Sequence, residues 1–154
     1  MDTCLYNSPI GILKISEDNG KIRSLYLHQK ENVSGYGGQH SGLLQEACHQ
    51  LDEYFQGKRK NFDLPICYEG TPFQEKVWRE LQRIPYGETR SYEDIAVKIG
   101  SPKAVRAVGQ ANNRNPILLI IPCHRVIHKN GDISGFACGI ENKRYLLDLE
   151  RLFF

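Results

Sequence analysis

Hydrophobic residues in the first thirty positions fall in three short runs separated by residues that favour turns. The runs cover 4–6, 12–15 and 22–27, and Asn7-Ser8-Pro9 and Asp18-Asn19-Gly20 separate them. Short apolar runs bounded by Asn, Gly and Pro are typical of strands joined by tight turns. The pattern therefore predicts an antiparallel meander of three strands.

Helical spacing replaces this pattern after a glycine-rich stretch at 35–38, which we expect to be a flexible loop. An apolar stripe at helical spacing runs up to Gly57 and predicts an amphipathic helix that covers the sheet; it consists of Leu43, Leu44, Ala47, Leu51, Tyr54 and Phe55. The segment 62–67 is a candidate further strand. We expect a domain boundary near residue 70.

From residue 71 onward the pattern predicts short capped helices. In Thr71-Pro72-Phe73-Gln74, Thr is the cap, Pro the first helical residue and Gln the partner in a capping box. The buried stripe of this helix is expected to be Phe73, Val77, Trp78, Leu81 and Ile84. A last helix is expected over 141–154, with Tyr145, Leu146, Leu149 and Leu152 on its apolar side.

Two further helices are expected between these elements, joined by a glycine turn. Ser91 opens the first, which Gly100 ends, and Ser101 caps the second, which Pro102 starts. Such a pair is typical of a helix-turn-helix DNA reader, although plain helix packing has the same pattern. Small residues flank Arg106 on the second helix, which would let its backbone approach a narrow surface such as a minor groove.

Composition indicates an ordinary globular chain. Of 154 residues, 40% are hydrophobic and 25% are charged, and no apolar run approaches the length of a membrane span. Because no basic segment followed by an apolar one opens the chain, we expect an intracellular, reducing compartment. The five widely spaced cysteines are an odd number, which favours free thiols over a disulfide framework.

Positive charge is concentrated in one part of the chain. Residues 1–70 carry seven Lys/Arg against nine Asp/Glu, whereas residues 71–154 carry thirteen against nine. Between Ile95 and Gly131 there are six basic residues and no acidic one. Such a block fits either a solvated face or a surface that meets a phosphate backbone.

The candidate chemistry lies at Cys123-His124-Arg125, where an apolar run ends in Pro122. A cysteine is a nucleophile as the thiolate, and a neighbouring base or cation favours that form. Two alternatives remain at this point. Cys123 could be a buried structural residue beside a surface His and Arg, or a zinc ligand together with His124 and His128.

Several motifs in order resemble one family. Five motifs occur in the order found in the 6-O-alkylguanine-DNA alkyltransferases, the methylated-DNA-protein-cysteine methyltransferases. They are Tyr86-Gly87-Glu88, Arg106-Ala107-Val108-Gly109, Asn115-Pro116, Pro122-Cys123-His124-Arg125 and Ser134-Gly135. The similarity covers roughly residues 71 to 150. It implies an α/β (α+β) fold, with a small N-terminal ribonuclease-H-like domain over 1–70. A mainly helical C-terminal domain with a helix-turn-helix would cover 71–154.

The resemblance also implies a chemistry. Cys123 is expected to take the alkyl group from the 6-oxygen of guanine in one irreversible turnover, and the 4-oxygen of thymine is a candidate further substrate. His124 is the base, acting through a bound water and held by Glu150, while Asn115 braces the turn and the active-site loop. No metal and no cofactor are expected.

The family acts on duplex DNA from the minor groove and rotates the damaged base out of the stack. Arg106 would fill the gap and Tyr92 would help to turn the nucleotide. Other DNA contacts are expected from the turn, the second helix and the Cys-His-Arg motif, namely Ser101, Lys103, Ala107, Gly109, Gln110 and Arg125. The base would lie against Pro116, Val126, Ile133, Ser134 and Gly135.

This sequence departs from the family pattern at two places in the active-site loop. Ile133 stands where some members carry a tyrosine that bonds the leaving guanine, so the Ser134 backbone is the expected substitute. Cys138 interrupts a Gly-Gly pair. The expected partner is duplex DNA bearing 6-O-alkylguanine, bound by a monomer without membrane association, in the cytoplasm, or in the nucleus if the source is eukaryotic.

Three other functions share parts of the pattern. An alkyltransferase-like damage sensor binds the same lesion but lacks the cysteine. A helix-turn-helix regulator with a structural Cys-His pair would form no covalent product. A thiol hydrolase would turn over repeatedly.

Overall fold

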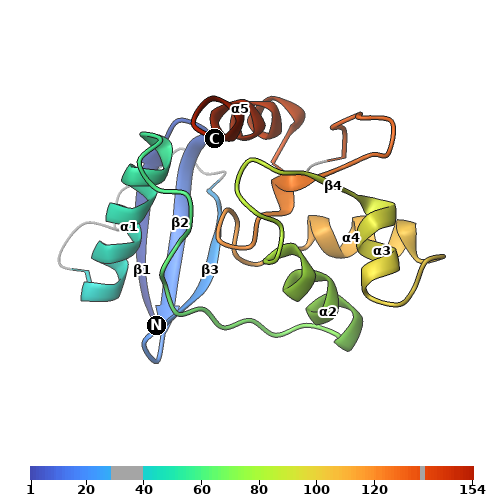
Figure 1. Cartoon of the computed structure of the whole chain (residues 1–154). Coiled ribbons are helices and arrows are strands. Elements are labelled where there is room, and N and C mark those ends of the chain that lie inside the picture. Colours follow the sequence, from blue (N-terminus) through green and yellow to red (C-terminus); the bar gives the residue numbers. More distant parts are fainter. Residues whose placement is uncertain (29–39, 136–137) are drawn as a thin grey trace. The chain divides into compact units, whose positions relative to one another are not determined.

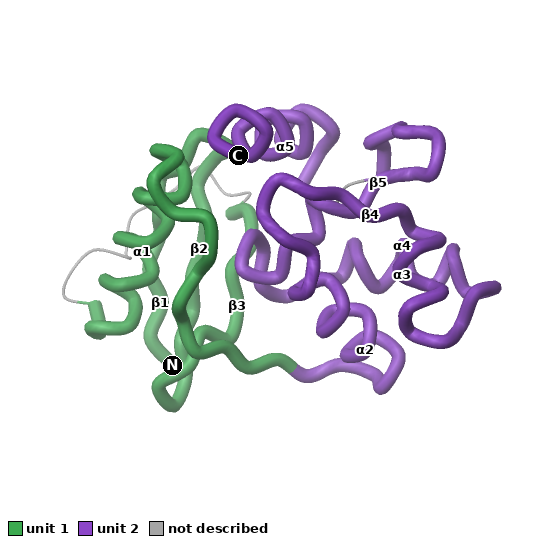
Figure 2. Tube along the Cα trace, in the orientation of Figure 1, with its two compact units in different colours: residues 1–68 green, residues 69–154 purple. Residues whose placement is uncertain are grey.

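The computed structural model describes residues 1–28, 40–135 and 138–154, which fall into two compact units, residues 1–68 and residues 69–154 (Figure 2). The chain has a mixed α/β fold, with a sheet in the first unit and mainly helices in the second (Figure 1). The glycine-rich stretch at 35–38, expected to be a loop, lies outside the described residues. No helix in the described part of the chain is long and apolar enough to cross a membrane.

In unit 1, the predicted meander is confirmed. Strands β1 (Asp2–Ser8), β2 (Gly11–Asp18) and β3 (Lys21–Leu27) pair antiparallel in that order, and α1 (Gly42–Phe55) packs against them (Figure 1). The core between sheet and helix consists of fully buried apolar residues, each contributing about 1.5–3 kcal/mol; they include Leu13, Ile15, Ile22, Leu25, Leu44, Leu51 and Tyr54.

The candidate strand at 62–67 is reduced to one bridge. Ile66 pairs with Ile22, where Ile22 N–H donates to the Pro65 carbonyl and Cys67 N–H donates to the Ile22 carbonyl. Proline has no backbone N–H and cannot continue a hydrogen-bonded ladder. The segment therefore touches the edge of β3 without becoming a strand of the sheet.

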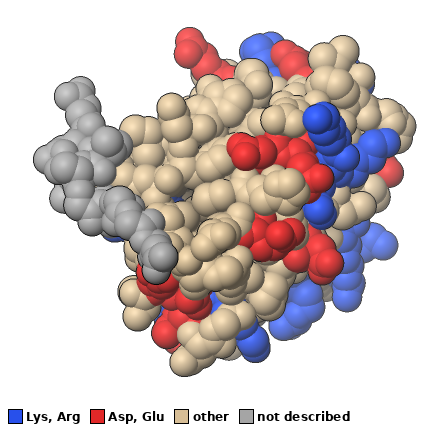
Figure 3. Space-filling model, turned by 90° about the vertical axis from the view of Figure 1, so that its left-hand side faces the viewer, with Lys and Arg blue, Asp and Glu red and all other residues tan. Residues whose placement is uncertain are grey.

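Charged side chains of both signs occur on the face that Figure 3 shows, which is viewed from the side where α1 lies in Figure 1. Acidic groups lie mainly over the middle and lower left of this view, basic groups gather toward its right-hand and lower edges, and most of this face is uncharged.

In unit 2, α2 (Pro72–Leu81), α3 (Tyr92–Lys98) and α4 (Val105–Asn113) pack on one another. Capping boxes start α2 and α3, with Thr71 and Ser91 as their caps. Two short strands, β4 (Arg90–Ser91) and β5 (Val126–Ile127), pair in parallel and hold the start of α3 beside the segment that follows Cys123. The chain closes with α5 (Ile140–Leu152).

The second helix of the predicted helix-turn-helix starts later than the sequence suggested. Ser101 and Pro102 lie in a turn, closed by Ala104 N–H donating to the Ser101 carbonyl at 2.9 Å, and α4 begins at Val105. Its N-cap, Ala104, offers no side-chain hydrogen bond, so the expected Ser101 cap was wrong. The turn between α3 and α4 is therefore longer than predicted.

The apolar side predicted for the last helix was also wrong in part. Leu146 and Leu149 are buried, but Tyr145 and Leu152 are 39% and 76% exposed. The buried face of α5 instead includes two charged side chains, Lys143 and Glu150. Hydrophobicity alone misplaces this face because the fold buries charge on it.

Candidate active site

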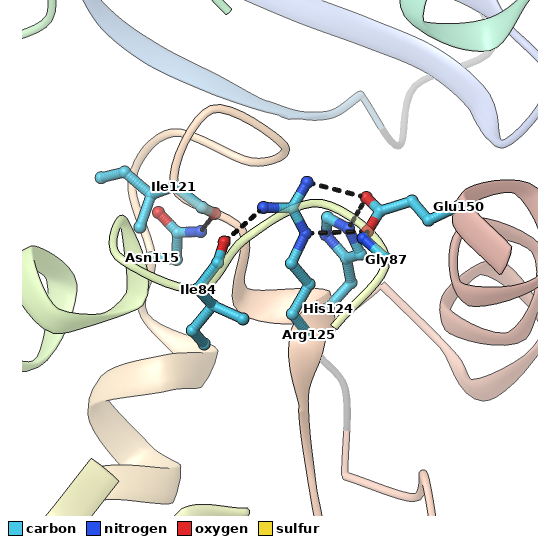
Figure 4. Close-up of polar contacts among 7 residues, drawn as sticks. All are labelled: Ile84, Gly87, Asn115, Ile121, His124, Arg125 and Glu150. Carbon is cyan, nitrogen blue, oxygen red and sulfur yellow. Dashed lines mark hydrogen bonds and ion pairs between the residues drawn. The ribbon is translucent and has the colours of Figure 1, made fainter. Parts of the chain in front are cut away.

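The apolar run at 117–121 forms a tight turn that leads into Cys123. Leu119 has a left-handed backbone, with φ of 71°, and Ile120 N–H donates to the Leu118 carbonyl at 2.7 Å. Asn115 spans the turn: its Nδ2 donates to the Ile121 carbonyl at 2.7 Å (Figure 4). Its Oδ1 accepts from Ile117 N–H at 2.9 Å. Both ends of the turn are thus tied to one amide side chain.

Cys123, His124 and Arg125 form a single 3-10 turn, η1 (Cys123–Arg125), in which all three residues are buried. Their exposed fractions are 2%, 1% and 6%. The alternative of a buried Cys beside a surface His and Arg is therefore excluded. The expected DNA contact of Arg125 was also wrong, because its guanidinium lies inside unit 2.

Glu150, on α5, joins these residues. His124 Nε2 lies 2.6 Å from Glu150 Oε2, and Arg125 donates from Nε to Oε1 at 2.8 Å and from Nη2 to Oε2 at 3.0 Å (Figure 4). Gly87 N–H also donates to Oε1 at 3.2 Å, and Arg125 Nη1 donates to the Ile84 carbonyl at 2.7 Å. One carboxylate thus connects α5, η1 and the turn that follows α2.

These contacts determine the charges. Burial opposes ionisation of Glu150, but the hydrogen bonds and charges of His124 and Arg125 outweigh it and hold its pKa below the usual range. Burial lowers the pKa of His124, against the effect of Glu150. At neutral pH, a neutral imidazole therefore faces an ionised carboxylate that Arg125 neutralises.

The tautomer of His124 follows from this charge state. A carboxylate can only accept hydrogen bonds, so Nε2 of the neutral ring carries the proton and donates a hydrogen bond to Glu150. Nδ1 then holds the lone pair, and among the described residues this buried atom has no hydrogen-bond partner. His124 is therefore oriented to accept a proton at Nδ1.

The thiol of Cys123 is protonated at rest. Burial raises its pKa to about 12, opposed by a hydrogen bond with Asn115 and by the charge of Lys143, while the nearby Cys138 raises it further. His124 and Arg125, which follow Cys123 in sequence, do not stabilise its thiolate directly, because His124 Nε2 and the Arg125 guanidinium are bonded to Glu150. A thiolate at Cys123 requires a proton acceptor at the moment of reaction.

Lys143 was not anticipated by the sequence analysis. It is fully buried on α5, where Nζ donates to the Val126 carbonyl at 2.5 Å and lies 5.8 Å from the centre of the Tyr92 ring. Burial lowers its pKa to about 8, against the effects of Cys123 and Asp132. In the sequence it lies in a polar run, Glu141-Asn142-Lys143-Arg144, which gives no sign of burial.

Tyr92, at the first position of α3, packs close to this cluster. It is 5% exposed, its ring centre lies 4.9 Å from that of His128, and burial together with the charge of Cys123 raises its pKa. Gly109 on α4 lies against the same ring, since a Cβ there would be 3.9 Å from it. The residue expected to turn the nucleotide thus lies near the reactive sulfur.

The remaining candidate DNA contacts lie on α4 and the turn before it. Arg106, Gln110 and Lys103 are exposed, and Ser101, Ala107 and Gly109 are partly exposed. These six residues are accessible to a partner, whereas Arg125 is not.

The residues expected around the base are unequally accessible. Val126 is fully buried, Pro116, Ile133 and Ser134 are partly exposed, and Gly135 is exposed with φ of 91°. The Ser134 amide donates to Asp132 Oδ1 at 2.9 Å. This amide would have to leave Asp132 to replace the missing tyrosine, and its role toward guanine stays a prediction.

Comparison with known proteins identifies the family. Residues 72–152 match the 6-O-methylguanine DNA methyltransferase DNA-binding domain, and residues 3–68 match the ribonuclease-like domain of the same family. The chain belongs to the 6-O-methylguanine DNA methyltransferase family. The two matches together cover both compact units.

Similar family members span nearly the whole chain. The constitutive methylated-DNA–protein-cysteine methyltransferase of Bacillus subtilis is 51% identical over 152 residues, covering 94% of this chain and 92% of the relative. The Methanosarcina acetivorans enzyme of that name is 46% identical, covering 95% and 96%. The crystal structure of Mycobacterium tuberculosis OGT in complex with DNA superposes with a TM-score of 0.90 at 41% identity, covering 99% of this chain and 94% of that one.

Proposed function

We propose that this chain repairs DNA by moving a methyl or other alkyl group from the 6-oxygen of guanine to Cys123, once per molecule. The observation that supports this most directly is the buried cluster of Cys123, His124 and Glu150 within the part of the chain that matches the family's DNA-binding domain. Similar proteins are named for methyl transfer from DNA to a protein cysteine.

The reaction begins with removal of the Cys123 proton. His124 accepts it at Nδ1 through a bound water, while Glu150 accepts the hydrogen bond from Nε2 and stabilises the imidazolium. Because burial raises the pKa of Cys123 to about 12, the thiol does not ionise appreciably on its own at neutral pH and needs His124 as its proton acceptor. The hydrogen bond of Asn115 and the charge of Lys143 stabilise the thiolate as it forms.

The sulfur then attacks the alkyl carbon in line with its bond to oxygen. A carbon–sulfur bond forms, the carbon–oxygen bond breaks, and its electron pair stays on the guanine oxygen. Guanine takes up one proton, which balances the proton that His124 accepted from Cys123. The product is a thioether at Cys123, and a thioether is not cleaved by water under ordinary conditions. The reaction therefore ends after one turnover.

DNA is bound from the minor groove by α4 and the preceding turn. Arg106 enters the stack where the damaged base leaves it, and Tyr92 helps to turn the nucleotide toward Cys123. The exposed polar groups of Lys103 and Gln110 contact the backbone, and the small residues Ala107 and Gly109 allow the helix to approach closely. Pro116, Val126, Ile133, Ser134 and Gly135 border the rotated base.

The protein acts as a monomer on duplex DNA inside the cell. Its division into a ribonuclease-H-like domain over 1–70 and a catalytic DNA-binding domain over 71–154 assigns every proposed reacting group to the second domain. The 4-oxygen of thymine is a further substrate of the same chemistry, since it offers an equivalent alkyl–oxygen bond.

Intact mass spectrometry with peptide mapping tests the proposal. After incubation with a duplex that contains one 6-O-methylguanine, we expect one methyl group on the peptide that holds Cys123, saturating at one per molecule. The control is the same duplex with guanine. Tight binding without a mass change would indicate a lesion sensor or a DNA-binding regulator, and continuous product release would indicate a hydrolase.

A further inference from the structure

A second pair of thiols lies in unit 1, far in sequence from Cys123. Cys4 on β1 and Cys48 on α1 are 44 positions apart, yet their sulfur atoms lie 3.7 Å from each other. Cys4 is 1% exposed, whereas Cys48 is partly exposed. Family membership explains Cys123 and leaves this pair without a role.

We propose that Cys4 and Cys48 form an oxidative modification site, at which a hydroperoxide converts the two thiols into a disulfide that links β1 to α1. The site is independent of alkyl transfer, since neither residue belongs to the cluster around Cys123. It reacts with the oxidant before the active thiol does.

The geometry favours a disulfide over other fates of the pair. A disulfide bond is about 2.05 Å long, so the sulfur atoms must approach by roughly 1.7 Å, which small side-chain rotations supply. The packing of α1 on β1 keeps the two sulfurs adjacent in the folded state. Among the described residues, no group of three or more His, Cys, Asp or Glu side chains could hold a metal ion, which argues against a metal site here.

The two thiols differ in a way that assigns their order of reaction. The hydrogen bond with Cys48 and burial both raise the pKa of Cys4. The same hydrogen bond lowers the pKa of Cys48, against burial and the charge of Asp52. Cys48 is therefore both the more accessible thiol and the first to ionise, and the thiolate is the form that attacks peroxide.

The reaction balances with a hydroperoxide as the oxidant. The Cys48 thiolate attacks one peroxide oxygen, the O–O bond breaks, and the other oxygen leaves as water or an alcohol after taking a proton, leaving a sulfenic acid. The sulfur of Cys4 then attacks the sulfur of Cys48, the S–S bond forms, and the S–O bond breaks with loss of water. Two electrons pass from the two sulfurs to the peroxide.

Cys123 offers a built-in comparison. It is 2% exposed and burial raises its pKa, so it presents little thiolate to an oxidant. Cys67, also in unit 1, is partly exposed like Cys48 and serves as the matched control.

The experiment treats the full chain with hydrogen peroxide, blocks remaining thiols with N-ethylmaleimide after denaturation, and maps peptides without reduction. We expect a linked peptide pair that contains Cys4 and Cys48. Its mass should be about 2 Da below the sum of the two free peptides, and dithiothreitol should separate them again. Cys48 should be lost roughly tenfold faster than Cys67 or Cys123. Cys48→Ala should abolish the link and Cys67→Ala should leave it intact.

A second variant keeps the test valid if Cys48→Ala folds poorly. In Cys4→Ala the sulfenic acid at Cys48 has no partner, so dimedone should trap it there. Random linkage among the cysteines, oxidation of Cys123 before Cys48, or a dimedone adduct no more frequent at Cys48 than at Cys67 would overturn the proposal. None of these readouts depends on alkyl transfer, so they are separate from the test of the proposed function.

Discussion

At the scale of single residues, Glu150 organises the candidate site. It lies 26 and 25 positions from His124 and Arg125 in sequence, and it contacts both through buried hydrogen bonds. Breaking a buried ion pair leaves an uncompensated charge and typically costs about 3–5 kcal/mol. The same carboxylate therefore supports the fold of unit 2 and the orientation of the proposed base.

Replacing Glu150 with Gln should reduce the rate of methyl transfer by about 100-fold or more, because the neutral amide no longer stabilises the His124 imidazolium. It should also alter the response to acid. The ionised carboxylate stabilises the folded state above its ordinary pKa of 4.5, and that stability is lost as pH falls below this value toward the lower folded pKa.

Urea unfolding at several pH values and single-turnover transfer rates would measure both effects. Glu141→Gln, an exposed carboxylate on the same helix, is the control and should change neither quantity. A variant at Glu150 that transfers methyl at the rate of the original protein would remove Glu150 from the mechanism.

Lys143 gives a pH dependence of the same sign as Glu150, but in the alkaline range. Its pKa is about 8 in the folded state and 10.5 ordinarily, so the unfolded chain binds the proton more tightly. The contribution of Lys143 to stability should therefore be least favourable below pH 8 and should rise between pH 8 and 10.5. The difference in unfolding free energy between the original protein and Lys143→Met, measured across this range, should grow in favour of the original protein. The exposed Lys98→Met should show no such trend.

At the scale of elements, the two helices of the helix-turn-helix begin differently. Ser91 caps α3 and its hydroxyl accepts from Asp94 N–H at 3.0 Å, whereas Ser101 lies in the turn before α4 and caps nothing in it. A serine followed by a helical pattern is thus a cap in one case and a turn residue in the other. Pro102 explains the difference, since a proline is equally compatible with position two of a turn.

This difference predicts two unequal substitutions. Ser91→Ala should lower the free energy of unfolding by about 1 kcal/mol, the usual value of a side-chain N-cap. Ser101→Ala should change it by less than about half that amount. Chemical denaturation of both variants measures the contrast, and equal losses would mean that Ser101 does cap α4.

The exposed face of α4 carries the next prediction. Arg106→Ala should reduce methyl transfer from duplex DNA far more than transfer from a free modified base, because only the duplex needs the gap filled. Arg114→Ala, at the other end of the helix, removes the same charge and should mainly weaken binding through salt-dependent contacts. If Arg106→Ala reduced methyl transfer equally on both substrates, Arg106 would act only as a phosphate contact.

At the scale of the whole molecule, the two units divide the chemistry. The cluster around Cys123 is contained in unit 2, and the Cys4–Cys48 pair is contained in unit 1. Each unit has its own buried core, drawn from its own segments. A change at one thiol site is therefore expected to leave the other site intact.

Cys123→Ala should abolish alkyl transfer while leaving lesion binding within a few fold of the original, because a buried thiol contributes little to the DNA surface. Fluorescence anisotropy at one fixed salt concentration, with methylated and unmodified duplexes, measures binding. Loss of all preference for the methylated duplex would show that the sulfur itself recognises the lesion.

The sequence by itself determined most of the elements and, through the family resemblance, the class of fold. Short apolar runs and turn residues in the first thirty positions predicted the meander, and Thr71 and Ser91 were identified as caps, because these are local effects of a residue on its neighbours. The motif around Cys123, together with several other short motifs in the same order, indicated the family.

Only the tertiary structure decided which groups meet. Adjacency suggested that His124 and Arg125 activate Cys123 directly, yet both bind Glu150, while Asn115 and Lys143 influence the sulfur. The resemblance implied that Glu150 holds His124, but nothing in the sequence indicated that Lys143 is buried, because burial depends on what packs against a helix, which its own residues do not specify. Cys4 and Cys48 likewise meet only because α1 folds onto β1. Contacts between distant segments depend on the packing of whole elements, and local pattern carries no information about them.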